Sequence, residues 1–208
     1  MNSSIYQAVQ LIKQKKTVIY PTETFFALGG MGTSSKVMEK IREIKGRPDH
    51  KPLPLVAGSL SQCLDFIRAD NLFQKIAEDF WPGPLSVLAC AADEIPYGVK
   101  DSQNMVSIRV TPHHDAANLC LMSGVPLIAT SANFSAKPSC ASLDSLDQDL
   151  LSKVSFVLDS CHVPAGGLPS TLVKIAGPGL LRVLRPGAVS LRQINEKGWE
   201  IENSQVFV

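Results

Sequence analysis

The spacing of hydrophobic residues along the chain switches repeatedly between the period of a helix and that of a strand. Val37, Ile41 and Ile44 recur at i, i+4 and i+7, which is typical of the buried face of a helix. The segment 17–20 is instead a short apolar run that stops at Pro21, as a buried strand does. The same criteria predict helices over 4–16, 35–44, 61–68, 72–79, 114–122, 143–151 and 190–196. They predict strands over 17–20, 53–57, 85–89, 105–110, 126–130, 155–158, 171–175 and 180–184.

This alternation predicts an α/β fold in which helices flank a mixed β-sheet. The last two strands are expected to form a hairpin, because Gly177, Pro178 and Gly179 separate them and such residues favour turns. No internal repeat, low-complexity segment or linker interrupts the pattern. We therefore expect residues 1–208 to form a single domain, which agrees with the usual size of roughly 100–200 residues.

Composition narrows the class of protein. Hydrophobic residues make up 45% of the chain and charged residues 19%, which excludes a disordered chain. With 20 Lys and Arg against 19 Asp and Glu, the net charge of +1 does not indicate a globally basic nucleic-acid binder, although a local basic patch stays open. The five cysteines contain no C-x-x-C pair and fit reduced thiols. Without a signal-peptide pattern or an apolar run of about 20 residues, we expect a cytoplasmic protein with no membrane partner.

Polar residues gather where the predicted strands end. Thr22 and Thr24 follow the strand 17–20, and Ser131 and Asn133 follow the strand 126–130. Arg109 lies in an otherwise apolar strand. Because residues i and i+2 of an extended segment point the same way, each pair is expected to share a face. Polar clusters at strand ends suit a ligand crevice in an α/β sheet.

Lys45 and Arg47 form the most informative of these pairs, and Lys51 follows four positions after Arg47. Two cations on one side repel each other unless an anion lies between them, and arginine and lysine both bind phosphates and carboxylates. The alternative is a solvated basic turn, because cations also favour a helix C-terminus. Ordinary explanations stay open for the other residues too: a polar turn at 131–133, turn capping at 22–24, and an ion pair for Arg109.

Seven short motifs in a fixed order extend from position 20 to position 187. They are YPTETFFALG at 20–29, KGRP at 45–48 with Pro52-Leu53, WPGPL at 81–85, SIRV at 107–110, SANFS at 131–135, PSTLV at 169–173 and LRPG at 184–187. In this combination the chain resembles the YrdC family, the threonylcarbamoyl-AMP synthases of transfer-RNA modification. The resemblance covers about 5–187 and implies a twisted mixed sheet, flanked by helices, with a concave basic cleft.

The resemblance implies a nucleotidyltransferase that forms threonylcarbamoyl-AMP and pyrophosphate from L-threonine, bicarbonate and ATP. Mg²⁺ is expected to arrive with ATP rather than in a protein site. A separate threonylcarbamoyl-transferase complex then modifies an adenosine in ANN-decoding tRNA. Lys45 and Arg47 are expected to act catalytically on the phosphates. The other expected ATP contacts are Lys51, Ser131, Asn133, Ser139 and Arg185. The expected threonine contacts are Thr24, Arg109, Ala129 and Ser170.

Several positions depart from the family pattern. Phe26 and Ala27 stand where Tyr-Gly is common, and Val56 stands where many members have a threonine-contacting histidine. The other departures are Lys51 for asparagine, Ala136 for glycine and Lys174 for aspartate. They leave the amino-acid specificity open. Because the sequence ends soon after Arg185, it resembles the short, single-domain members.

Two other functions compete with synthase activity. The same basic face could bind tRNA or another RNA without catalysis, which the low net charge disfavours because RNA binding depends on many phosphate contacts. The chain could also be a carbamoyl-transfer paralogue related to hydrogenase maturation proteins. The acylphosphatase and zinc-finger segments of those proteins have no counterpart in this sequence.

Overall fold

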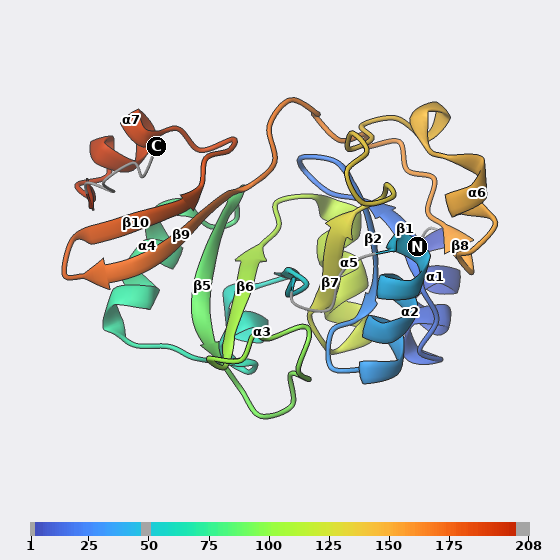
Figure 1. The fold of residues 1–208 in the computed structure, drawn as a ribbon, viewed down its shortest axis with the longest axis horizontal. Coiled ribbons are helices and arrows are strands. Elements are labelled where there is room, and N and C mark those ends of the chain that lie inside the picture. The colour runs from blue at the N-terminus through green and yellow to red at the C-terminus, as the bar shows by residue number, and fades with distance from the viewer. Residues whose placement is uncertain (1–2, 47–50, 203–208) are drawn as a thin grey trace.

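The structure, a computed structural model, describes residues 3–46 and 51–202 and contains a mixed α/β fold (Figure 1). Its helices are α1 (Ser3–Lys13), α2 (Ser35–Lys45), α3 (Leu60–Leu64), α4 (Asn71–Phe80), α5 (His114–Ser123), α6 (Gln148–Leu151) and α7 (Leu191–Glu196), with a 3-10 turn at Leu143–Ser145. Its strands are β1 (Val18–Pro21), β2 (Phe26–Met31), β3 (Leu55–Ala57), β4 (Ile67–Arg68), β5 (Leu85–Ala91), β6 (Met105–Val110), β7 (Leu127–Ser131), β8 (Phe156–Val157), β9 (Thr171–Gly177), β10 (Leu180–Arg185) and β11 (Glu200–Ile201).

The described strands form one sheet in the order β11-β10-β9-β5-β6-β3-β7-β2-β1-β8, and β4 pairs with β5 outside this path. The pairs β3–β6, β5–β9, β1–β8 and β10–β11 are parallel, and the remaining pairs are antiparallel. The predicted mixed sheet is thereby confirmed. Strands from the first and last thirds of the chain meet through β5, β6 and β3 at the centre of the sheet.

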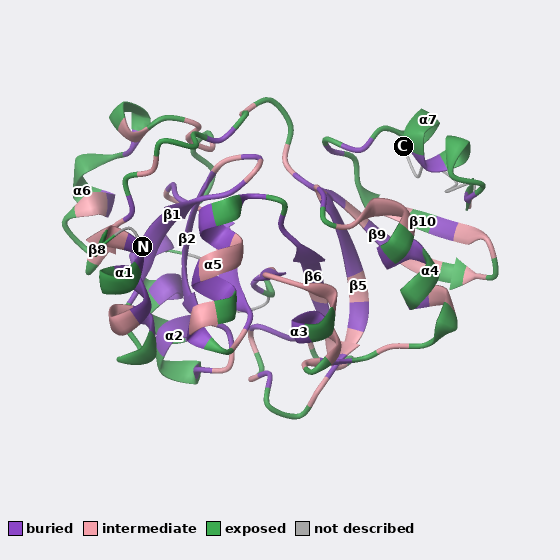
Figure 2. Ribbon diagram, turned by 180° about the vertical axis from the view of Figure 1, so that it is seen from behind, coloured by how far each residue is buried: buried purple, intermediate pink, exposed green. Residues whose placement is uncertain are grey.

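Hydrophobic residues of alternate positions build a core on each face of the sheet. Ile19 lies in the cluster that also contains Ile41 of α2, whereas Val18 and Tyr20 lie in the cluster that contains Leu119 of α5. Figure 2 shows the buried residues concentrated on the central strands, with exposed residues on the outer turns of the helices. Burial of these apolar side chains is the main force that holds the helices on the sheet.

Several predicted elements need correction. Strand β2 was not predicted, because its FALGGM sequence contains two glycines and weakens a strand pattern. Gly29 is needed there: a Cβ atom would lie 1.8 Å from the carbonyl oxygen of Ile128 in neighbouring β7. The predicted helix 61–68 ends at Leu64, and Ile67–Arg68 instead pairs with β5 as strand β4. The helix predicted over 143–151 is a 3-10 turn followed by the separate α6.

Other elements match their prediction closely. The strand predicted over 105–110 is β6, and the hairpin predicted around residues 177–179 is the antiparallel pair β9–β10. None of the helices within the described ranges combines the length and the apolar composition needed to cross a bilayer.

Candidate functional site

A cavity of about 460 Å³ lies where the β1–β2 connection approaches β5, β6, β7 and the start of β9. This volume falls in the range of roughly 300–1,000 Å³ that is usual for small-molecule sites. Seven of the eleven residues expected at the site line this cavity: Thr24, Arg109, Ala129, Ser131, Ser139, Ser170 and Arg185. The structure thus brings the four predicted threonine contacts together with three of the seven predicted ATP contacts.

The other four expected residues do not line this cavity in the described part of the chain. Asn133 lines a second cavity of about 260 Å³, and Ser139 borders both cavities. Lys45 and the exposed Lys51 line neither of them. Arg47 lies outside the described residues, so its predicted role stays a prediction.

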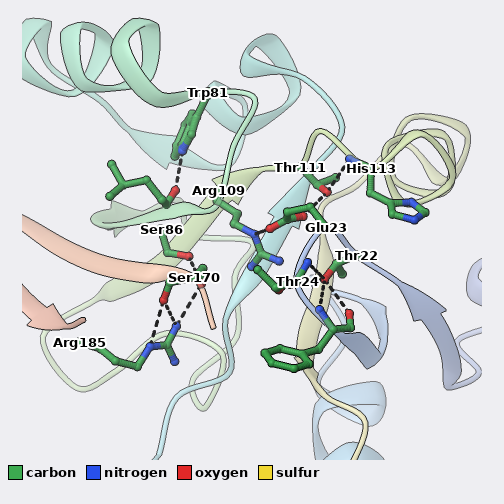
Figure 3. Close-up of polar contacts among 12 residues, drawn as sticks. Thr22, Glu23, Thr24, Trp81, Ser86, Arg109, Thr111, His113, Ser170 and Arg185 are labelled. Carbon is green, nitrogen blue, oxygen red and sulfur yellow. Dashed lines mark hydrogen bonds and ion pairs between the residues drawn. The ribbon is translucent and has the colours of Figure 1, made fainter. Parts of the chain in front are cut away.

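Arg109 reaches the cavity from β6, as the alternation of that strand predicted. Ser107 and Arg109 border the cavity, whereas Val106 and Ile108 are fully buried in the core. The Arg109 side chain is only 5% exposed, and its Nε donates a hydrogen bond of 2.7 Å to Oε1 of Glu23 (Figure 3). Within the described residues, Nη1 and Nη2 donate no hydrogen bond to the protein, so this edge of the guanidinium is available to a ligand.

Glu23 is a member of the site that the sequence prediction missed. Its second oxygen, Oε2, accepts a 2.7 Å hydrogen bond from Oγ1 of Thr111 (Figure 3). Burial by itself raises the pKa of Glu23, but the charge of Arg109 and the hydrogen bond from Thr111 outweigh burial, and the pKa lies below its ordinary value. The group is therefore a carboxylate at neutral pH. The sequence feature that could have indicated Glu23 is an acidic residue between two threonines, just after a buried strand.

Arg185 approaches the cavity from the end of β10. Its Nη2 donates to the carbonyl oxygen and to Oγ of Ser170, at 2.8 and 3.0 Å. Burial, and then the charge of nearby Arg109, lowers the pKa of Arg185. Two like-charged guanidinium groups therefore face one cavity, and an anionic ligand would relieve their repulsion.

The position of Arg185 depends on a close approach between two segments of backbone. A Cβ atom on Gly187 would lie 2.2 Å from the carbonyl oxygen of Pro169, so only glycine fits there. The Ser170 hydroxyl also lies 3.0 Å from the hydroxyl of Ser86 on β5. These contacts hold the LRPG and PST motifs against each other beside the cavity.

Lys45 lies behind the cavity wall rather than in an extended segment. It is the last residue of α2, and the C-cap Gly46 has a left-handed φ of 58°. Only 3% of Lys45 is exposed, which contradicts the solvated-turn alternative for this residue. Its Nζ donates to the carbonyl oxygens of Ser131 and Asn133 and, at 3.1 Å, to Oδ1 of Asn133. Lys45 therefore fixes the SANFS loop that borders both cavities.

Thr22 and Thr24 combine the two roles that the sequence left open. Both border the cavity, and their hydroxyl oxygens lie 3.3 Å apart. Thr22 Oγ1 also donates to the carbonyl oxygen of Phe25 at 2.7 Å, which closes the turn between β1 and β2. The pair therefore lines the cavity and also caps the turn between β1 and β2, as both interpretations of the sequence predicted.

The departures from the family pattern divide into two groups. Phe26 and Ala27 border the cavity. Val56 is fully buried in the cluster that contains Tyr20, and neither it nor Lys174 on β9 lines the cavity. Ala136 has a φ of 68°, in the left-handed region that favours the glycine of the family motif. Of these departures from the family pattern, those at Phe26 and Ala27 change the lining of the cavity, whereas that at Val56 does not.

The residues of the site suit anions better than a resident metal ion. The charged residues that line the cavity in the described part of the chain are Arg109 and Arg185. The described residues contain no group of three or more His, Cys, Asp or Glu side chains arranged to hold a metal ion. Arg109 and Arg185 give the cavity two positive charges. The basic character expected for the whole cleft stays a prediction.

A family model named for Sua5, YciO and YrdC and described as "Telomere recombination" matches residues 10–187. The chain is 34% identical to the threonylcarbamoyl-AMP synthase of Bacillus subtilis over 91% of its own length and 55% of that protein. It is 31% identical to the Pyrococcus abyssi threonylcarbamoyl-AMP synthase, over 93% of this chain and 57% of that protein. The chain thus spans a little more than half the length of these two relatives.

The fold is also similar to that of a solved structure, the crystal structure of P. abyssi Sua5 complexed with L-threonine. The two structures superpose with a TM-score of 0.87 at 29% sequence identity. The superposition covers 95% of this chain and 58% of that chain. The fold of this chain therefore follows that of a protein whose crystal structure was determined in complex with L-threonine.

Proposed function

Because the chain belongs to the Sua5/YciO/YrdC family, we propose that it is a threonylcarbamoyl-AMP synthase. The observation that carries this proposal is the convergence of seven expected contact residues on one cavity, five of them from five separate motifs. The resemblance to the YrdC family implies these residues, and strands far apart in the sequence bring them together. A chance resemblance of short motifs would not predict such a convergence.

Threonine binds in the part of the cavity between Arg109 and Thr24. The free Nη edge of Arg109 receives the carboxylate, since a guanidinium edge matches two carboxylate oxygens. Thr24 and Ser170 offer hydroxyl groups to the amino acid, and Ala129 offers the backbone of β7. This arrangement leaves the amine of threonine directed toward the remainder of the cavity.

ATP binds on the side of the cavity that Ser131, Ser139 and Arg185 border. Lys45 supports this side by fixing Ser131 and Asn133. Contacts of Lys45, Arg47 and Lys51 with the phosphates form the untested part of the proposal. Mg²⁺ enters as part of the MgATP substrate, since the lining residues supply cations rather than carboxylate ligands.

The reaction needs positioning and charge neutralisation rather than a protein nucleophile. The threonine amine combines with bicarbonate to give a carbamate, and water is released. A carbamate oxygen then attacks the α-phosphorus of ATP. As this O–P bond forms, the bond from the α-phosphorus to the bridging oxygen breaks and pyrophosphate leaves. Arg185 stabilises negative charge near the phosphates, and Arg109 holds the amino acid in line for the attack.

The product is a mixed anhydride, which is an activated form of the threonylcarbamoyl group that a second protein can transfer. We propose that a threonylcarbamoyl-transferase complex accepts it and modifies ANN-decoding tRNA. Direct contact between this chain and RNA is a separate possibility that catalysis does not require.

The identity of the product distinguishes synthase activity from the two competing functions. The experiment incubates the protein with MgATP, threonine and ¹³C-bicarbonate and examines the nucleotides by mass spectrometry. We expect an adduct of AMP with threonine that carries the heavy carbon. An RNA-binding protein would give no adduct. A carbamoyl-transfer paralogue would give an adduct only in a parallel incubation with carbamoyl phosphate in place of threonine and bicarbonate, and either result would contradict the proposal.

A further inference from the structure

Glu23 is a largely buried carboxylate that joins two elements, and its partner Arg109 lines the cavity. Its side chain is 12% exposed, and it accepts hydrogen bonds of 2.7 Å from both Nε of Arg109 and Oγ1 of Thr111. Figure 3 shows Glu23 between these two side chains, next to the threonine pair at 22 and 24. Arg109 belongs to β6, whereas Glu23 belongs to the connection from β1 to β2, 86 positions earlier.

Further contacts hold Glu23 and its second hydrogen-bond partner, Thr111, in place. Thr111 Oγ1 accepts a 3.2 Å hydrogen bond from the backbone N–H of His113, the N-cap residue of α5. The backbone carbonyl oxygens of Glu23 and Thr24 accept hydrogen bonds from the N–H groups of Ala165 and Gly166, at 3.3 and 2.8 Å. The carboxylate is therefore fixed both through its side chain and through its backbone.

We propose that Glu23 is the positioning residue that aims Arg109 at the substrate carboxylate, and that Thr111 in turn holds Glu23. This inference rests on the proposed function. A guanidinium group offers two edges to a carboxylate, one formed by Nε and one Nη and the other formed by both Nη atoms. Because Glu23 occupies Nε, Arg109 presents the Nη edge to the ligand. The amino acid is thereby held in one orientation.

Removal of the negative charge of Glu23 distinguishes a positioning role from a purely electrostatic role. Arg109 and Arg185 place two positive charges at the cavity, and Glu23 compensates one of them. If Glu23 acted only through its charge, its removal would strengthen the binding of an anion. If it positions Arg109, removal weakens the binding because the guanidinium can rotate away. The two roles therefore predict changes of opposite sign.

The test measures steady-state KM for threonine, KM for ATP and kcat in the Glu23→Ala, Glu23→Gln and Thr111→Val variants. A misplaced binding group can cost up to about 100-fold, so we expect Glu23→Ala to raise KM for threonine roughly 10- to 100-fold. Glu23→Gln keeps an oxygen that can accept from Arg109 Nε and should rescue most of this loss. Thr111→Val should raise KM for threonine about 3- to 10-fold. KM for ATP should change less than about twofold in each case.

A double-mutant cycle tests whether Glu23 acts through Arg109. Glu23→Ala should add little to the KM for threonine when it is combined with Arg109→Ala, because effects of coupled residues are not additive. The matched control is Asp93→Asn, which removes the carboxylate of the exposed pair with Arg68 and should leave all constants unchanged.

The possible outcomes are distinct. If Glu23→Ala does not fold, Thr111→Val still reports on the positioning of the carboxylate. An unchanged or lower KM for threonine in Thr111→Val and Glu23→Ala overturns the positioning role while wild-type turnover persists. Wild-type protein without threonine-dependent turnover overturns the proposed function, and the inference with it.

Discussion

Lys45, the last residue of α2, donates a hydrogen bond of 3.1 Å from Nζ to Oδ1 of Asn133, which lies 88 residues further along the chain. The same ammonium group donates to the backbone carbonyl oxygens of Asn133 and Ser131. One buried cation thus fixes the conformation of the loop that borders both cavities. Lys45 therefore contributes to the folded structure as well as to the proposed ATP site.

The substitution Lys45→Met tests this double role, because methionine keeps an apolar stem and removes the ammonium group. We expect the free energy of unfolding to fall by about 1–3 kcal/mol, since buried carbonyl oxygens lose a partner. We also expect kcat/KM for ATP to fall roughly 30- to 1000-fold, which corresponds to about 2–4 kcal/mol. Thermal unfolding and steady-state kinetics measure the two effects.

Lys40→Met is the matched control on the same helix, since Lys40 forms an exposed pair with Glu43. It should change neither quantity appreciably, because exposed pairs contribute about 0–1 kcal/mol. Normal stability in Lys45→Met would show that the loop holds its conformation without the ammonium group.

Arg109→Lys keeps the positive charge and removes the fork of nitrogen donors. An ammonium group that pairs with Glu23 does not present the planar, two-donor edge that matches a substrate carboxylate. We therefore expect KM for threonine to rise at least about tenfold, with KM for ATP nearly unchanged. Because Glu23 is a buried carboxylate, we also expect a loss of about 1–3 kcal/mol of stability. Loss of stability with normal threonine kinetics would assign Arg109 to the fold alone.

Hydrophobic periodicity, a short-range pattern, predicted the mixed sheet, whereas the resemblance to the YrdC family implied which residues meet at the site. Periodicity located β6 and placed Arg109 on its cavity face. It failed at β2, where the need for Gly29 arises from the carbonyl oxygen of Ile128, a contact between distant segments. It failed for Glu23 for the same reason: nothing local pairs a carboxylate with an arginine 86 positions away.

Glu23 makes the stability of the protein depend on pH in a defined direction. Its pKa is lowered in the folded state by Arg109 and Thr111, against the effect of burial. A depressed pKa contributes stability that is complete above the pKa of the unfolded chain, about 4.3 for glutamate. This contribution is lost as the pH falls through the lower pKa of the folded state. Chemical denaturation of wild type and Glu23→Gln from pH 7 to 3 should show a stability difference that shrinks on acidification. A constant difference would contradict the pKa shift.

Val56→His places the histidine that many relatives have into this chain. Val56 is fully buried on β3 in the apolar cluster that contains Tyr20 and Leu119. An imidazole without a hydrogen-bond partner at that point should cost about 1–3 kcal/mol of stability. Calorimetric titration should show threonine affinity changed by no more than a few-fold. A clear gain in affinity at unchanged stability would show that the ring reaches the cavity and restores a missing contact.

Release of pyrophosphate from MgATP, with threonine and bicarbonate omitted in turn, tests the proposed synthase activity most directly. If the cavity binds threonine beside ATP and its carbamate attacks the α-phosphorus, release should require both additions. Omission of either should reduce the rate to that of a control without protein. Release that continues without threonine and bicarbonate, or no release when all three substrates are present, would contradict the assignment.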